Sequence, residues 1–71
     1  MQTLRSSEQL RRARSQLQWT QDILAKRARV PVALVKRLES LDGPLDAGAK
    51  IEMIRALQAA LEKAGVRFPE G

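Results

Sequence analysis

Cysteine and histidine are both absent from this sequence. The absence of cysteine excludes a disulfide framework and a thiolate metal site. The absence of histidine removes the commonest general base and the other good zinc ligand. We therefore expect no metal and no other cofactor.

A long apolar segment is also missing. The longest apolar run, residues 30–35 with its proline, is far shorter than the roughly 20 residues of a membrane-spanning helix. The first twenty residues contain no apolar segment flanked by positive charge, so no signal peptide is expected. These features predict a cytoplasmic protein with no membrane partner.

Residues suited to catalysis are scarce as well. The chain has no histidine to activate a serine and no Gly-rich phosphate loop, so we expect no enzyme. Asp42 and Asp46 flank a turn, and we interpret them as a turn former and a helix N-cap rather than as an acid/base pair. The serines that lack an activating histidine are Ser6, Ser7, Ser15 and Ser40.

Positive charge is abundant and unevenly distributed. The 71 residues, enough for one domain, carry a formal net charge of +5. Residues 1–41 contain nine Lys/Arg against three Asp/Glu, whereas residues 42–71 contain four against five. Clustered positive charge favours a polyanionic partner such as DNA, RNA or an acidic protein. A solvated basic surface that only aids solubility is an equally good interpretation of charge alone.

Capping signals and apolar spacing predict four helices, at about residues 6–17, 20–28, 31–41 and 46–64. Ser6 with Gln9 has the pattern of a capping box, and Thr20 is a natural N-cap for the second helix. Pro31 suits the first turn of the third helix, and Gly65 suits the C-terminal cap of the fourth. The fold class is therefore all-α: residues 1–5 as a flexible arm, a four-helix domain over 6–64, and a tail over 65–71 with a possible short strand.

The predicted third helix has two different arcs. Leu34, Val35, Leu38 and Leu41 share the apolar one. The opposite arc holds Val32, Ala33, Lys36, Arg37 and Ser40, with Glu39 at the boundary. The expected core of the domain consists of Leu10, Leu17, Trp19, Leu24, Ala25, Ala28, Val35, Leu38, Ile51, Ile54, Leu57 and Leu61.

The second and third helices form a short-turn hairpin in which Ala25 permits close approach and Val30 can fill the angle. Here the sequence resembles the Cro/phage-repressor (XRE-like) helix-turn-helix family. The resemblance rests on Thr20-Gln21, Leu24-Ala25, Val30, Val35, Leu38-Glu39, Arg14 upstream, and the closing segment RALQAALEKAGVRF. It implies a lambda-repressor-like fold with a long C-terminal helix, and a sequence-specific regulator of transcription that binds double-stranded DNA. Such a protein would be associated with the nucleoid when bound.

The same resemblance implies roles for individual residues. The third helix would enter the major groove, and Arg14 would pair with Glu39 to bridge the first and third helices. The implied base-reading residues are Val32, Ala33, Lys36 and Arg37, and the expected phosphate contacts are Thr20, Gln21, Lys26, Arg29 and Ser40. The family pattern usually has glycine where this chain has Arg29, and serine or threonine where it has Pro31.

The fourth helix carries more apolar surface than one core-facing stripe needs. Ile51, Ile54, Leu57 and Leu61 should face the hairpin. A homodimer interface is expected from Ala49, Met53, Ala56, Ala60 and Phe68, although alanines chosen only for helix propensity would give a similar pattern. The alternative function is a protein-interaction adaptor or antitoxin-like module that binds another regulator through the hairpin.

Overall fold

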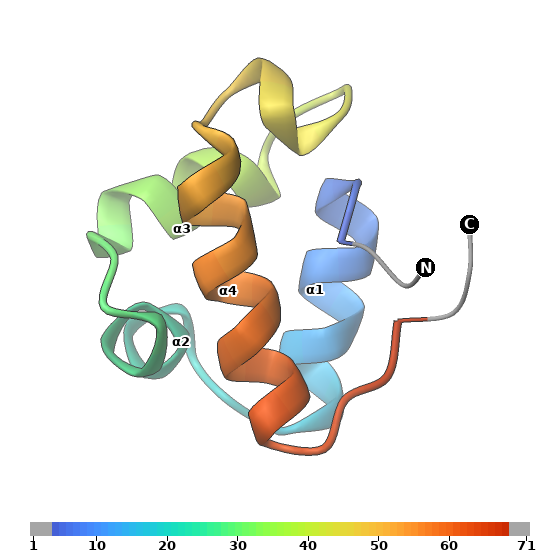
Figure 1. Ribbon diagram of the computed structural model, residues 1–71, viewed down its shortest axis with the longest axis vertical. Coiled ribbons are helices and arrows are strands. Elements are labelled where there is room, and N and C mark those ends of the chain that lie inside the picture. Colours follow the sequence, from blue (N-terminus) through green and yellow to red (C-terminus); the bar gives the residue numbers. More distant parts are fainter. Residues whose placement is uncertain (1–3, 69–71) are drawn as a thin grey trace.

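The computed structural model describes residues 4–68, which form four α-helices and a short 3₁₀ turn. The all-α prediction is confirmed. In Figure 1, α4 runs through the middle of the molecule, with α1 on one side and α2 and α3 on the other. The elements are α1 (Ser7–Gln16), α2 (Gln21–Ala28), α3 (Val32–Glu39), η1 (Leu45–Ala47) and α4 (Ile51–Lys63).

The first two helices begin where their caps predict. The Ser6 side chain accepts from the Gln9 backbone N–H, and the Gln9 side chain accepts from the Ser6 N–H, which completes the capping box. Thr20 accepts from the Ile23 N–H and caps α2. Pro31 is the residue before α3 rather than its first helical residue, and it provides no side-chain cap.

The fourth helix begins five residues later than predicted. Asp46 does not cap it; Asp46 lies in η1, and α4 begins at Ile51 after Lys50. The intervening Gly48 passes so close to the end of α3 that a Cβ there would lie 3.4 Å from Leu38 Cδ2 and 2.7 Å from Cδ1 of Leu41, two residues past the helix. Close packing of the loop against α3 therefore interrupts a helix that the local pattern favours.

The expected flexible arm is wrong for the residues that can be described. Leu4 is 4% exposed, and its N–H donates to Gln58 Oε1 on α4. The Arg5 carbonyl accepts from Leu45 N–H, so this segment is fixed against η1 and α4. Residues 1–3 of the arm lie outside the described residues.

The tail also differs from expectation. Residues 66–68 form no strand, and the single β-bridge of residues 4–68 joins Ser6 to Pro44. Val66 and Phe68 are 7% and 2% exposed, because the tail folds back along α1 (Figure 1). The prediction that Phe68 lies in a dimer interface is therefore wrong, since its side chain is already covered within one chain. Residues 69–71 lie outside the described part.

The core lies where α1, α2, α3 and α4 meet, and α2 packs against both α3 and α4. Ile51, expected in the core, is 54% exposed because it occupies the first turn of the late-starting α4. Leu17 and Trp19 are only partly buried. The buried apolar residues are Leu4, Leu10, Ala13, Leu24, Ala25, Ala28, Val30, Val35, Leu38, Leu45, Ile54, Leu57, Leu61, Val66 and Phe68. Within residues 4–68, no helix has the length and apolar character to cross a membrane.

Candidate functional site

The candidate site centres on α3, whose inner side contains a buried carboxylate. The Glu39 side chain is 5% exposed and lies opposite Arg14 of α1. Arg14 donates from Nε to Glu39 Oε2 at 2.7 Å and from Nη2 to Oε1 at 3.0 Å. Gln21, at the start of α2, donates from Nε2 to the same Oε1 at 3.0 Å. A buried carboxylate needs such donors, and here three of them come from two other helices.

Arg14 also reaches the link between α1 and α2. Its Nη1 donates to the Trp19 carbonyl oxygen at 2.9 Å. The Trp19 ring is in turn covered by the Arg27 guanidinium, whose Cζ lies 5.6 Å from the ring centroid, a cation–π distance. The Arg14 guanidinium therefore connects α1, the link after it and α3. These contacts fix the orientation of α3 relative to α1.

Two further side chains of α1 hold the C-terminal end of α3. Arg11 Nη1 donates to the Glu39 carbonyl oxygen, and Ser7 Oγ donates to the Leu41 carbonyl oxygen at 2.9 Å. The last carbonyls of a helix have no partners within it, and cations are favourable there. Ser7, Arg11 and Arg14 are spaced four and three residues apart, which places them on one face of α1. Sequence reasoning used only Arg14, although this spacing was visible.

The turn between α2 and α3 contains a residue in the left-handed conformation. Arg29 has φ 60° and ψ 43° at the C-cap of α2. Val30 is 8% exposed, and its N–H bonds to the Ala25 carbonyl oxygen, so it fills the angle of the hairpin. Left-handed backbone is costly for a residue with a side chain, which is why glycine is common in such a place. The Arg29 side chain itself is exposed.

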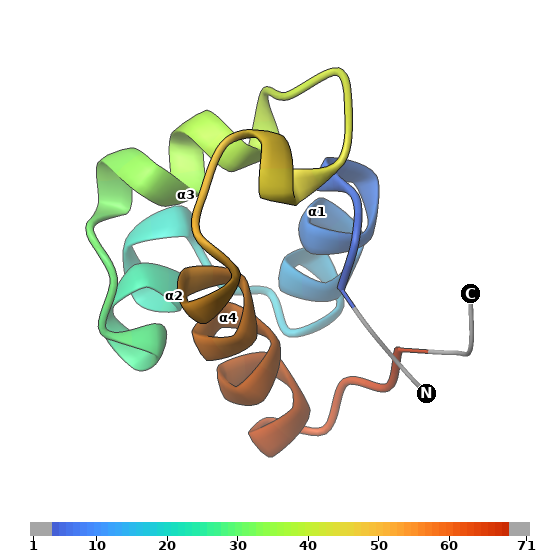
Figure 2. The ribbon, with the colours of Figure 1, turned by 45° about the horizontal axis from the view of Figure 1, so that its top comes forward.

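The outer arc of α3 is open to solvent. Ala33, Lys36 and Arg37 are exposed, and Val32 at its edge is half-buried. Neither cation forms an ion pair with another residue in the described part of the chain. Ser40 Oγ donates to the Lys36 carbonyl oxygen at 2.9 Å, so its hydroxyl hydrogen is already used. Figure 2 shows α3 along an outer edge of the molecule, with α2 beneath it and η1 near its C-terminal end.

The remaining expected contact residues lie on α2. Thr20 is exposed, and its oxygen acts as an acceptor in the cap, which leaves its hydroxyl hydrogen for another partner. Gln21 is half-buried and is linked to α3 through Glu39. Lys26 is exposed on the side of α2 that faces away from the buried Leu24 and Ala28. The structure thus joins Gln21 to the α3 site and leaves Lys26 separate from it.

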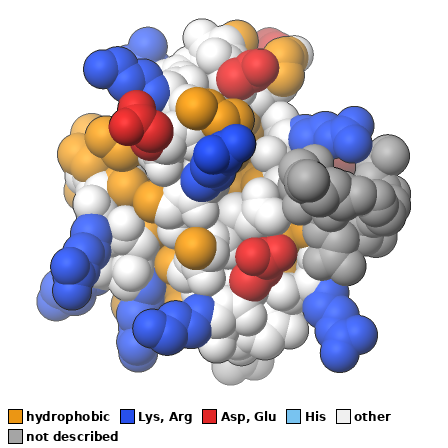
Figure 3. Space-filling model, viewed as in Figure 1, with side chains coloured by type: hydrophobic (Ala, Val, Ile, Leu, Met, Phe, Trp, Pro, Cys, Tyr) orange, Lys and Arg blue, Asp and Glu red, His pale blue; other side chains and the backbone are white. Residues whose placement is uncertain are grey.

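The surface of α4 mixes apolar and charged side chains. Met53 is 38% exposed, and Ala49, Ala56 and Ala60 are partly buried against the core. Figure 3 shows this side of the molecule, where Lys and Arg side chains are spread around the apolar atoms rather than gathered in one patch.

No protein-family model matches the chain, and no curated protein or solved structure is significantly similar to it. The site is therefore interpreted from its own geometry: a short helix held rigidly on one side and presenting two cations on the other.

Proposed function

We propose that the chain is a helix-turn-helix DNA-binding protein of the Cro/phage-repressor (XRE-like) type, which regulates transcription by placing α3 in the major groove. The observation that carries the proposal is the exposed arc of α3, where Ala33, Lys36 and Arg37 have no covering element among the described residues. A helix fits the major groove, and an arginine fork can donate to guanine O6 and N7 together.

The network behind α3 supports this use. Base reading requires a helix held at a defined angle, and rigid elements hold such geometry better than loops. The Arg14–Glu39 pair fixes one end of α3 against α1, and Gln21 joins the start of α2 to the same carboxylate. The amide of Gln21 has a second N–H, which would donate to a phosphate beside the positive end of α2.

Around α3, the exposed Thr20, Lys26 and Arg29 are proposed as phosphate contacts. Phosphate contacts position a protein on the duplex, whereas base contacts specify the sequence. Ser40 is the weakest member of the expected set, because its hydroxyl hydrogen bonds to Lys36. Val32, half-buried at the edge of the arc, would contact a thymine methyl only together with Ala33.

The direct test is selection of bound duplexes from a random DNA pool, followed by titration at several salt concentrations. Enrichment of a defined sequence supports the proposal. The logarithm of the association constant should fall linearly with the logarithm of salt, with a slope of about −0.9 per phosphate contact. Recovery of no preferred sequence, together with affinity that does not respond to salt, would contradict it.

The second candidate function is a protein-interaction module that uses the same arc. The apolar residues Val32 and Ala33 favour it, because they offer no hydrogen bond to a base. The salt series separates the two functions. The affinity of an apolar protein contact should change little over the salt range in which the affinity for DNA falls steeply.

We further propose that the active form is a two-fold homodimer formed through Met53, Ala49, Ala56 and Ala60. Small residues allow close approach of two helices, and a dimer would set two copies of α3 about 34 Å apart, one turn of DNA. Met53→Glu should leave a monomer in sedimentation, whereas Arg55→Glu, at an exposed position on a different face of α4, should not. A wild type that is monomeric both alone and on DNA would exclude the dimer.

A further inference from the structure

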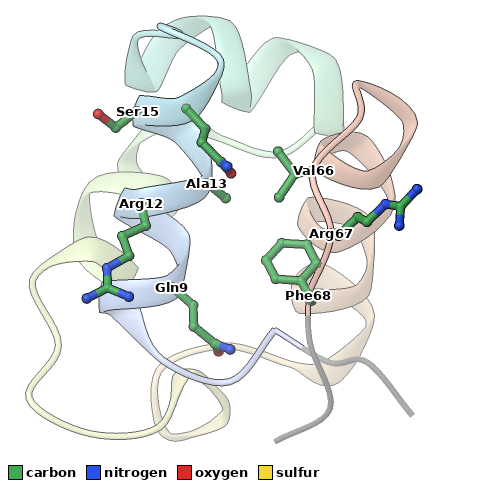
Figure 4. A pocket seen from close by; sticks show the side chains of 8 residues that line it. Gln9, Arg12, Ala13, Ser15, Val66, Arg67 and Phe68 are labelled. Atoms are coloured by element: carbon green, nitrogen blue, oxygen red, sulfur yellow. The ribbon is translucent and has the colours of Figure 1, made fainter.

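A groove lies on the other side of α1, away from the α3 site. It has a volume of about 490 Å³ and separates α1 from the tail (Figure 4). Its floor is apolar: Ala13, Val66 and Phe68 are all below 10% exposed, and in Figure 4 the Val66 and Phe68 side chains point toward α1. The remaining lining residues are polar or charged: Gln9, Arg12, Ser15, Gln16 and Arg67.

The charge of the groove has one sign. Among the described residues, its lining contains two cations and no acidic residue. Arg12 and Arg67 lie on its two outer edges, and in Figure 4 both guanidinium groups point away from the space between α1 and the tail. Arg12 pairs with Glu8 at 3.2 Å, but the side chains are 80% and 67% exposed. A pair so exposed contributes little to stability, so Arg12 can exchange this carboxylate for another at small cost.

The tail offers backbone groups as well. Val66 and Phe68 turn inward and Arg67 turns outward, an alternation typical of an extended chain. Val66 N–H bonds to the Leu61 carbonyl oxygen, but the N–H and C=O of Arg67 bond to no other residue in the described range 4–68. An extended chain with unpaired peptide groups can accept an added strand.

We infer that this groove binds an extended, acidic segment of another polypeptide, which lies beside residues 66–68 as an added strand. Apolar side chains of the segment would rest on Val66 and Phe68, and its carboxylates would reach Arg12 and Arg67. The inference does not depend on DNA binding, because no groove residue belongs to α2 or α3.

The test uses the full chain and a short labelled peptide that alternates aspartate with valine. We expect micromolar binding, with NMR shifts at Ala13, Val66 and Phe68 and none at Ala33. Replacing both Arg12 and Arg67 with alanine should weaken binding about tenfold, because two exposed ion pairs contribute only a modest part of the affinity. Lys50→Ala with Arg55→Ala is the matched control, because Lys50, just before α4, and Arg55, on α4, are exposed cations outside the groove; it should change binding less than about twofold.

Two altered peptides examine the mode of binding. The same peptide with lysine for aspartate should not bind, and a version methylated at alternate backbone nitrogens should lose most of its affinity because strand pairing uses those N–H groups. Equal binding of the methylated peptide would exclude an added strand. NMR shifts of groove residues on addition of random duplex DNA would assign Arg12 and Arg67 to a nucleic-acid surface. Concentration-dependent dimerisation that is lost when both arginines are replaced would assign the groove to a second copy of the chain. Either result overturns the proposal.

Discussion

The two sides of α3 are built in opposite ways. On the inner side, Glu39 is buried and receives three hydrogen bonds from Arg14 and Gln21. On the outer side, Lys36 and Arg37 are exposed, and neither forms an ion pair within residues 4–68. An eight-residue helix thus separates the residues that hold it in place from the residues that can contact a partner. Substitutions on the two sides should therefore affect different measurements.

The largest expected effect is on the inner side. Glu39→Ala leaves the Arg14 guanidinium without its carboxylate, which should lower the free energy of unfolding by about 3 kcal/mol. That is a large share of the stability of a small domain. Urea denaturation followed by circular dichroism measures the loss, and Glu52→Ala, an exposed carboxylate on α4, should change stability by less than about 0.5 kcal/mol. If Glu39→Ala unfolds at the urea concentration of the wild type, the network does not stabilise the fold.

On the outer side, Arg37→Ala should leave stability unchanged and weaken binding. We expect a loss of about 1–3 kcal/mol on a selected duplex and little loss on a scrambled one, because a bidentate contact to guanine is specific. Fluorescence titration of both duplexes at equal salt measures the difference. An equal loss on both duplexes would mean that Arg37 contacts a phosphate instead, and no loss on either would favour the protein-interaction function.

Lys26→Ala provides the comparison for Arg37. Lysine is a flexible point charge and does not recognise a base pair by shape. The substitution should weaken selected and scrambled duplexes alike and reduce the salt slope by about one unit. The measurement is the same titration repeated at several salt concentrations. A loss confined to the selected duplex would show that α2 takes part in sequence recognition.

The smallest expected effect concerns the turn before α3, where stability and binding should change in opposite directions. Arg29 has a φ of 60°, a conformation that glycine adopts without strain. Arg29→Gly should therefore raise the free energy of unfolding by about 0.5–1 kcal/mol while weakening DNA binding through the lost cation. Arg29→Ala is the matched control, since it removes the charge but keeps the strained backbone. A less stable Arg29→Gly variant would show that the arginine side chain itself supports the turn.

Local signals in the sequence predicted much of the fold. The caps at Ser6 and Thr20 act within three residues of the chain, so their geometry follows from sequence alone. The same signals failed at Asp46, because Gly48 packs against Leu41, just after α3, and against Leu38 of α3, and these contacts lie outside the local capping pattern. Ile51 then became exposed as a consequence of the later helix start.

In the candidate site, too, some features follow from local sequence and others depend on tertiary contacts. Helical spacing predicted that Ala33, Lys36 and Arg37 share an exposed arc, and they do. It did not predict that Arg11 and Ser7 hold the end of α3, because their acceptors are backbone carbonyls, which every residue possesses. A side-chain pair leaves a signal in the residue types of both partners, whereas a bond to a carbonyl leaves one only in the donors, here the shared face of Ser7, Arg11 and Arg14.

The sequence by itself determined the helical character of this protein, its main caps, and the two arcs of α3, since each depends on spacing within a few residues. Only the tertiary structure decided that Phe68 is covered, that Leu4 is fixed to α4, and that a groove separates α1 from the tail. These features arise from contacts between segments distant in the chain. These contacts are stabilised by the burial of apolar side chains such as those of Leu4 and Phe68, and no local pattern in the sequence reveals that burial.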